Sequence, residues 1–173
     1  MNGLNIRAPG PVMLSGINAL GAVPVGGITG PTLAESISRG LISGTFTQFG
    51  AMETFRLGDV VTHYMDLPLG ATPMLILMNK AKYDGLSDVA KAAIDQHSGA
   101  AFSERFGNSF DANVAEAGER MLAENDIAVV SAADAPVEDW QNALAVATTD
   151  WIAANENGQA IYDAFLKAIE EAK

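Results

Sequence analysis

Residues 3–25 read GLNIRAPGPVMLSGINALGAVPV, and this stretch decides how the rest of the chain is interpreted. The apolar run at residues 4–6 is typical of a short strand, and a Pro-Gly-Pro turn follows it. Pro11 suits the first turn of a helix, apolar residues follow it at helical spacing, and Gly21 stops the helix. Residues 22–25 form a second short strand. This succession of strand, helix and strand predicts an α/β layer structure.

The same alternation of short apolar runs with glycine and proline continues to about residue 80, after which helical periodicity dominates. We find no internal repeat and no linker that marks a domain boundary. The further strands expected are residues 44–49, 60–65, 73–78 and 127–130, and the further helices are residues 31–41, 89–125 (with Gly99, Gly107 and Gly118 as possible bends), 138–154 and 159–172.

The charge is unevenly distributed along the 173 residues, which carry a net charge of −11. Residues 1–82 contain five Lys/Arg and four Asp/Glu, whereas residues 83–173 contain five and seventeen. Such an acidic chain is a poor partner for nucleic-acid phosphate or an anionic membrane surface. Its nearly neutral first half still leaves a lone cation able to attract an anion.

Arg7 is the lone cation that stands out, because no other Lys or Arg occurs in the first 38 residues. It leaves an apolar strand and enters a turn, where burying an unpaired guanidinium would cost several kcal/mol. Three interpretations remain open from the residues alone. Arg7 reaches solvent, pairs with an internal carboxylate, or waits for an anionic ligand.

We identify no motif for catalysis, metal binding or a cofactor in this sequence. The glycine-rich run at residues 21–32 lacks both the GxxxxGK[ST] spacing and its lysine, so a flexible connection is the better interpretation. His63 and His97 are 34 residues apart without metal-ligand spacing. The absence of cysteine excludes disulfides and thiolate sites. We therefore predict no enzyme activity, no cofactor and no metal site.

A series of motifs, in order and at matching spacing, resembles the C-terminal part of the solute-binding proteins of tripartite ATP-independent periplasmic (TRAP) transporters. In that family a GLKIR strand precedes a helix and an ALGA-x-P turn, a second helix follows, and a later apolar strand ends in MNK. The similarity is clear from residue 3 to about residue 100. Beyond that point only the helical pattern is similar. The corresponding segments here are residues 3–9, 19–24, 36–44, 57–61 and 74–80.

The resemblance implies a periplasmic-binding-protein-like α/β fold and a ligand site around Arg7. The family arginine at this position forms a two-pronged salt bridge with the substrate carboxylate. The asparagine of sialic-acid binders corresponds to Thr47, and the Glu-Trp pair of metal-dependent keto-acid binders corresponds to Phe46-Thr47, so the metal-ligating carboxylate is missing. The remaining wall, made of Phe46, Phe49 and Met52, favours a carboxylate with an apolar or aromatic body.

The resemblance also implies that residues 1–173 form a single partial unit. Residues 3–65 correspond to the second lobe, residues 66–110 to a segment that would return to a first lobe, and residues 111–173 to a helical remainder that packs on the second lobe. We expect the first lobe and a secretory signal to be absent from the chain as it stands. The surface left uncovered then favours a homo-oligomer.

The function expected from this resemblance is that of a truncated extracytoplasmic solute-binding subunit, periplasmic by resemblance. It would bind a small organic acid through Arg7 and deliver it to the membrane permease subunits of a transporter. The alternative is a self-associating half-domain scaffold that has lost ligand binding. An enzyme of unknown type is a third reading that no motif supports.

Overall fold

The opening stretch forms the centre of a small parallel sheet in the computed structural model, which describes residues 1–67, 69–70 and 73–171. The middle strand has a parallel neighbour on each side, and its Ile6 lies opposite Pro24 on one side and Gly44 on the other. The predicted α/β architecture is thereby confirmed. The strands, in the order β2-β1-β3, are β1 (Asn5–Arg7), β2 (Val23–Val25) and β3 (Gly44–Thr45).

A second sheet joins two segments that are far apart in the sequence. Strand β4 (His63–Asp66) pairs in parallel with β5 (Ala128–Ser131), so that Tyr64 lies opposite Val129. The expected strand at residues 127–130 is confirmed within one residue. The expected strand at residues 60–65 starts later, because the backbone N–H groups of the first two residues bond to the carbonyl of Leu57 in a turn.

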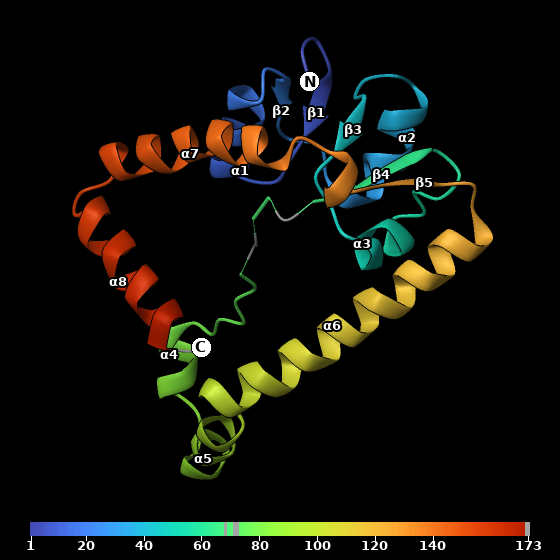
Figure 1. Ribbon diagram of the computed structural model, residues 1–173. Helices are drawn as coiled ribbons and strands as arrows, with labels where there is room; N and C mark the ends of the chain where they lie inside the picture. Colours follow the sequence, from blue (N-terminus) through green and yellow to red (C-terminus); the bar gives the residue numbers. More distant parts are fainter. Residues whose placement is uncertain (68, 71–72, 172–173) are drawn as a thin grey trace.

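Helices cover the sheets and extend well beyond them (Figure 1). The predicted helical run from residue 89 to residue 125 is interrupted at His97 and Ser98, and Gly99, the first residue after the break, adopts a φ of 70°. The last predicted helix reaches Glu171; Ala172, where that prediction ended, lies outside the described residues. The helices are α1 (Pro11–Ala19), α2 (Leu33–Ser38), α3 (Phe49–Thr54), α4 (Lys80–Asp84), α5 (Asp88–Gln96), α6 (Gly99–Glu124), α7 (Val137–Ala154) and α8 (Gly158–Glu171), with single 3-10 turns at η1 (Gly30–Thr32) and η2 (Ala132–Asp134).

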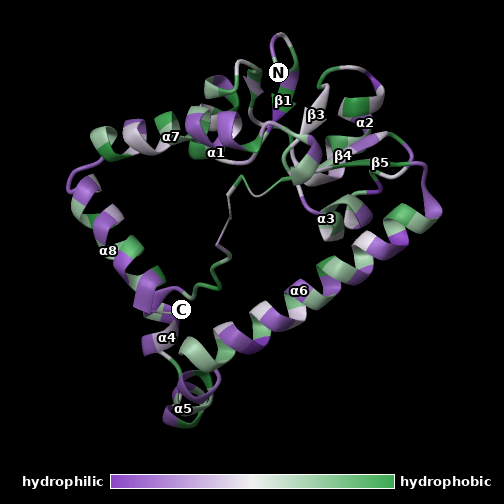
Figure 2. Ribbon diagram, in the orientation of Figure 1, coloured by the Kyte–Doolittle hydropathy of each residue, from purple (hydrophilic) through white to green (hydrophobic). Residues whose placement is uncertain are grey.

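The ribbon forms an open triangular frame (Figure 1). The sheets with α1, α2 and α3 occupy one corner, α6 and the pair α7–α8 form two sides, and α4 and α5 lie near the corner where these sides approach each other. Hydrophobic and hydrophilic residues alternate around α6 and α8, as in amphipathic helices (Figure 2). None of the helices among the described residues combines the length and apolar character needed to cross a bilayer.

Two apolar clusters form the core, both near the sheets. One lies under β1 and α1 and contains Ile6 and Ile17. The other brings α2, α3 and the C-terminal end of α6 together, with Leu33, Met52 and Met121 fully or almost fully buried. The core therefore supports the C-terminal ends of β1 and β3.

The apolar run at residues 73–78 does not form the strand that its composition predicts. It has no regular secondary structure, and Leu75, Ile76 and Leu77 are 74%, 71% and 82% exposed. A strand needs a neighbour for its backbone N–H and C=O groups, and no neighbouring strand accompanies this run among the described residues. The β propensity of the run is real, but propensity alone does not form a sheet.

The predicted strand at residues 44–49 is also shorter than expected, since only Gly44 and Thr45 pair with β1. β1 itself ends at Arg7 and offers no further partner. Gln48 then caps a helix by accepting the Ala51 N–H at its side-chain oxygen, 3.2 Å away. Phe49 is consequently the first residue of α3 and not the last residue of a strand.

We predict that Leu33→Ala lowers the free energy of unfolding by about 2–5 kcal/mol, because Leu33 is 1% exposed within the core and its truncation leaves a cavity. Leu41→Ala is the matched control, since Leu41 is 60% exposed and should cost at most about 0.5 kcal/mol. Urea unfolding followed by circular dichroism measures both. Equal losses for the two variants would contradict the core described above.

Candidate functional site

The backbone of the central strand delivers Arg7 to the C-terminal edge of the sheet. Arg7 is the last residue of β1 and lies opposite Val25 of β2 and Thr45 of β3. Its carbonyl accepts the Phe46 N–H at 3.0 Å, so the residues following β3 lie beside it. Ligands of open α/β sheets characteristically bind outside the carboxyl ends of the strands. Arg7 is thus at the edge where such a site is expected.

The side chain of Arg7 is half-buried and makes one hydrogen bond, from Nε–H to the main-chain carbonyl of Ile28, 2.9 Å away. No carboxylate of the described residues forms an ion pair with Arg7, and its two terminal nitrogens have no hydrogen-bond partner there. Burial lowers the pKa of the guanidinium, which nevertheless stays charged at neutral pH. An internal carboxylate partner is therefore absent from the described part of the chain.

Phe46 and Thr47 follow β3 directly and flank the Arg7 edge. Phe46 is half-buried against the cluster that contains Ile6 and Ile17, so one side of its ring is packed. Thr47 is half-buried as well. Both residues therefore follow the strand that pairs with the end of β1, and the Phe46 N–H bonds to the Arg7 carbonyl.

Phe49 and Met52, the other two residues expected in the wall, belong to α3 and pack into the core. Met52 is 1% exposed, which leaves it a structural role in supporting α3. The Phe49 ring stacks on Tyr64, with ring centroids 4.0 Å apart, and lies so close to Gly118 that a Cβ added there would be 3.0 Å from it. The structure thus connects Phe49 to β4 and α6 more closely than to Arg7.

An open hollow of about 440 Å³ lies next to Phe49 and Tyr64, between β4 and the C-terminal half of α6. Asp66, Asp111 and Glu119 lie along its rim. Burial raises the pKa of the Tyr64 hydroxyl, and the charge of Asp66 adds to this effect. Sequence reasoning did not single out Tyr64, because nothing in the strand-like pattern around it indicated that α6 returns to that point.

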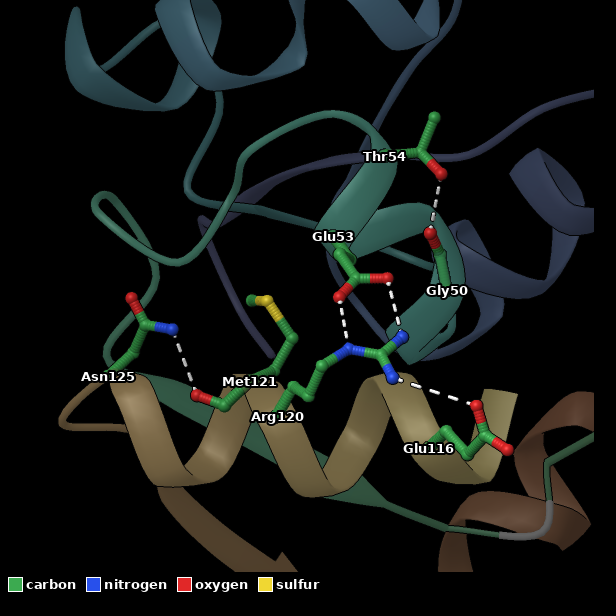
Figure 3. A network of polar contacts seen from close by, with 7 residues as sticks. All are labelled: Gly50, Glu53, Thr54, Glu116, Arg120, Met121 and Asn125. Atoms are coloured by element: carbon green, nitrogen blue, oxygen red, sulfur yellow. Dashed lines mark hydrogen bonds and ion pairs between the residues drawn. The ribbon is translucent and has the colours of Figure 1, made fainter. Parts of the chain in front are cut away.

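A polar brace holds α3 against α6 (Figure 3). Arg120 donates from Nε to Oε1 of Glu53 at 2.8 Å and from Nη2 to Oε2 at 3.0 Å, while its Nη1 lies 3.7 Å from Glu116. Asn125 donates to the Met121 carbonyl near the end of the same helix. The hydrogen bond from Arg120 is the main reason that the pKa of Glu53 lies below its ordinary value, and the same contact raises the pKa of Arg120. This brace ties α3, which carries Phe49, to α6.

Glu53→Gln should lower the melting temperature at neutral pH, because it removes the carboxylate that binds both nitrogens of Arg120. A Glu whose pKa is lowered in the folded state contributes stability above its ordinary value of 4.5, and this contribution is lost as the pH falls through the lower folded pKa. The difference between wild type and variant should therefore vanish in acid. Melting curves from neutral pH down to about pH 3 measure it.

Glu35→Gln is the control for this experiment, since Glu35 forms a comparable pair with Arg39 within a single helix, and both of those side chains are more exposed. A larger loss of stability in Glu35→Gln than in Glu53→Gln would contradict a structural brace between α3 and α6.

Chemical groups for a metal site are missing from the described residues, where no cluster of three or more His, Cys, Asp or Glu side chains that could hold an ion is found. The arrangement around Arg7 instead offers a guanidinium whose two terminal nitrogens have no hydrogen-bond partner among the described residues, in a strand whose last carbonyl accepts the Phe46 N–H. Such an arrangement is suited to binding a planar anion.

Comparison with known proteins identifies the family. The family model of bacterial extracellular solute-binding proteins, family 7 (DctP), matches residues 1–155. The chain belongs to this family. The resemblance seen in the sequence motifs is thereby confirmed, and the DctP family consists of solute-binding proteins that serve transport and not of enzymes.

Solved structures of TRAP solute-binding proteins share the fold. A marine metagenome protein specific for aromatic acid ligands, in complex with metahydroxyphenylacetate, is 32% identical, covers 88% of this chain and 49% of its own, and has a TM-score of 0.77. A protein from Rhodoferax ferrireducens with copurified benzoate is 25% identical, with coverages of 87% and 48% and a TM-score of 0.73. These two proteins support the periplasmic-binding-protein-like fold expected from the sequence.

A third structure, from Bordetella bronchiseptica with bound (R)- and (S)-mandelate, is 24% identical, covers 99% of this chain and 56% of its own, and has a TM-score of 0.78. This likeness shows the fold alone. The DctP-family chain described here therefore spans about half the length of the solved relatives that it matches.

Proposed function

We propose that this chain is the arginine-bearing part of a solute-binding subunit of a TRAP-type transporter, and that Arg7 binds the carboxylate of an organic acid with an apolar or aromatic body. The observation that carries the proposal is the state of Arg7. Its guanidinium is charged and half-buried at the C-terminal edge of the sheet, and its terminal nitrogens have no partner among the described residues. A planar carboxylate matches two such nitrogens.

The aromatic character of the ligand is supported by two observations. Phe46 and Thr47 follow β3, and the Phe46 N–H bonds to the Arg7 carbonyl. Neither side chain is charged, so an apolar ligand body beside them would not force a charged group out of water. Two relatives, at 32% and 25% identity, were solved with metahydroxyphenylacetate and with benzoate, which are both aromatic acids. We assign Phe46 and Thr47 to the wall of the site, and Phe49 to the support of that wall from α3.

The cellular setting follows from the family. TRAP solute-binding proteins are periplasmic and work with membrane components, and we propose the same place and the same permease partners for this chain. We retain the division expected from the motifs, in which residues 3–65 belong to the lobe that carries Arg7 and residues 66–110 lead toward another lobe; of these, residues 68 and 71–72 lie outside the described residues.

Arg7→Ala should abolish the thermal stabilisation that benzoate or 3-hydroxybenzoate confers on the protein. Removing one partner of a buried charged pair costs about 2–5 kcal/mol, equivalent to a loss of affinity between about 30-fold and several thousand-fold. Benzamide, which has the same ring without the negative charge, should not stabilise either protein. Thermal shift and isothermal titration calorimetry measure these differences.

Arg39→Ala is the control variant, because Arg39 is an exposed arginine whose partner is Glu35 of the same helix. It should bind benzoate as the wild type does. Binding of benzoate by Arg7→Ala with unchanged affinity would contradict the proposed function, and so would equal stabilisation of the wild type by benzamide.

A second candidate function, a self-associating scaffold, is favoured by the apolar surface that the frame leaves open. The run at residues 73–78 is exposed, and α8 presents Ile161, Phe165, Leu166 and Ile169 with 41% to 60% of each side chain exposed. Several large apolar side chains exposed together are typical of an interface. We propose that a second copy of the chain covers it, whether or not the ligand site is active.

The chain should elute as a homo-oligomer in size-exclusion chromatography with light scattering at micromolar concentration. Leu75→Lys combined with Leu77→Lys should shift it to the monomer mass, because two charges would have to be buried in the interface. Val12→Lys is the control, since Val12 is an exposed residue of α1 on another part of the frame. A wild-type monomer under these conditions would rule out self-association through this surface.

A further inference from the structure

The main-chain carbonyl of Ile28 accepts the one hydrogen bond found for the Arg7 guanidinium among the described residues. We propose that Ile28 is a positioning residue, which occupies Nε of Arg7 and so directs the two terminal nitrogens to receive a carboxylate end-on. This inference rests on the proposed function and assigns a role to a residue that the sequence motifs did not single out.

An arginine can hold a carboxylate in two ways, and the chain itself contains one of them. Arg120 binds Glu53 side-on, through Nε at 2.8 Å and Nη2 at 3.0 Å. The corresponding edge of Arg7 is not available, because its Nε–H already donates to Ile28 at 2.9 Å. Only the edge formed by the two terminal nitrogens can then present two parallel N–H groups to a planar anion.

The carbonyl of Ile28 is held in place by the packing of its own side chain and by the turn that follows it. The Ile28 side chain is half-buried and packs against the cluster that contains Leu33 and Met52. On the following side, Thr32 donates to the Thr29 carbonyl from both its N–H and its hydroxyl, each at 3.1 Å, which fixes the turn into η1. The carbonyl is therefore anchored to the core by an apolar side chain and not carried on a free loop.

Two glycines allow the loop to take this course. Gly27 precedes Ile28 and adopts a φ of 79°, which a residue with a side chain rarely tolerates. Gly30 lies against the outer end of the Phe55 ring, and a Cβ at Gly30 would collide with that ring. The glycine-rich run at residues 21–32, which has no phosphate-binding spacing, thus acquires a physical role in placing the Ile28 carbonyl.

The consequence of this contact is a guanidinium that is ordered before the ligand arrives. A free arginine side chain would lose rotamer entropy on binding, whereas one already held at Nε loses less. Fixing the plane of the guanidinium also fixes the direction from which the carboxylate approaches. The apolar packing of Ile28 therefore influences affinity at a distance from the ligand.

The decisive measurement is hydrogen exchange of the Arg7 Nε–H by ¹H–¹⁵N NMR in the ligand-free protein, combined with benzoate affinity from calorimetry. In the wild type the Arg7 Nε–H should exchange at least about tenfold more slowly than that of Arg39, whose contact with Glu35 is made through Nη2. Ile28→Ala should speed the exchange of Arg7 and weaken benzoate binding by about tenfold.

Ile37→Ala is the matched control, because Ile37 is another half-buried isoleucine that packs on the same cluster. It should lower stability without changing either the Arg7 exchange rate or the benzoate affinity. Ile28→Val keeps a branched apolar side chain and should restore both quantities to nearly wild-type values.

Fast exchange of the Arg7 Nε–H in the wild type, with benzoate binding retained, would overturn the role of Ile28 and leave the proposed function standing. Equal weakening of benzoate binding in Ile28→Ala and Ile37→Ala would also overturn the role of Ile28. Slow exchange without any benzoate binding in the wild type would overturn the proposed function instead.

Discussion

The pairing of β1 with a parallel strand on each side is the constraint on which the rest of the structure depends. A central strand must satisfy its backbone groups on both edges, and β2 and β3 do so over the same few residues. Because β1 ends at Arg7, the two connections that follow its neighbours converge beside that side chain. One supplies the Ile28 carbonyl and the other supplies Phe46. The environment of the guanidinium is therefore a product of sheet topology.

The long helix α6 performs a different task, because it returns the chain to the sheets after the excursion through α4 and α5. Its contact with α3 includes the Glu53–Arg120 brace (Figure 3). Phe49 also packs against Gly118 of this helix. An exposed ion pair adds little stability by itself, whereas the apolar contact beneath it supplies burial. The ion pair and the apolar contact together hold α3 against α6. This arrangement packs Phe49 against Tyr64 of β4 and Gly118 of α6.

Much of the fold was predictable from local patterns. Pro11 and Gly21 bracketed α1 because each acts on its own backbone, and the late strand and the two terminal helices followed from apolar periodicity. The run at residues 73–78 was mispredicted for the opposite reason. Strand formation requires a partner elsewhere in the chain, and apolar composition cannot reveal whether that partner exists. The prediction that Phe49 ends a strand was wrong for the same reason, since the end of β1 decides where β3 stops.

The sequence by itself determined the α/β class, the membership of the solute-binding family and the position of Arg7 at the end of a strand. These depend on spacing, turn residues and motif order, all of which are local. Only the tertiary structure decided that Arg7 has no carboxylate partner among the described residues and that Ile28 holds it at Nε. A main-chain carbonyl carries no sequence signature, because every residue has one. Its selection as a partner depends on where the fold brings the loop.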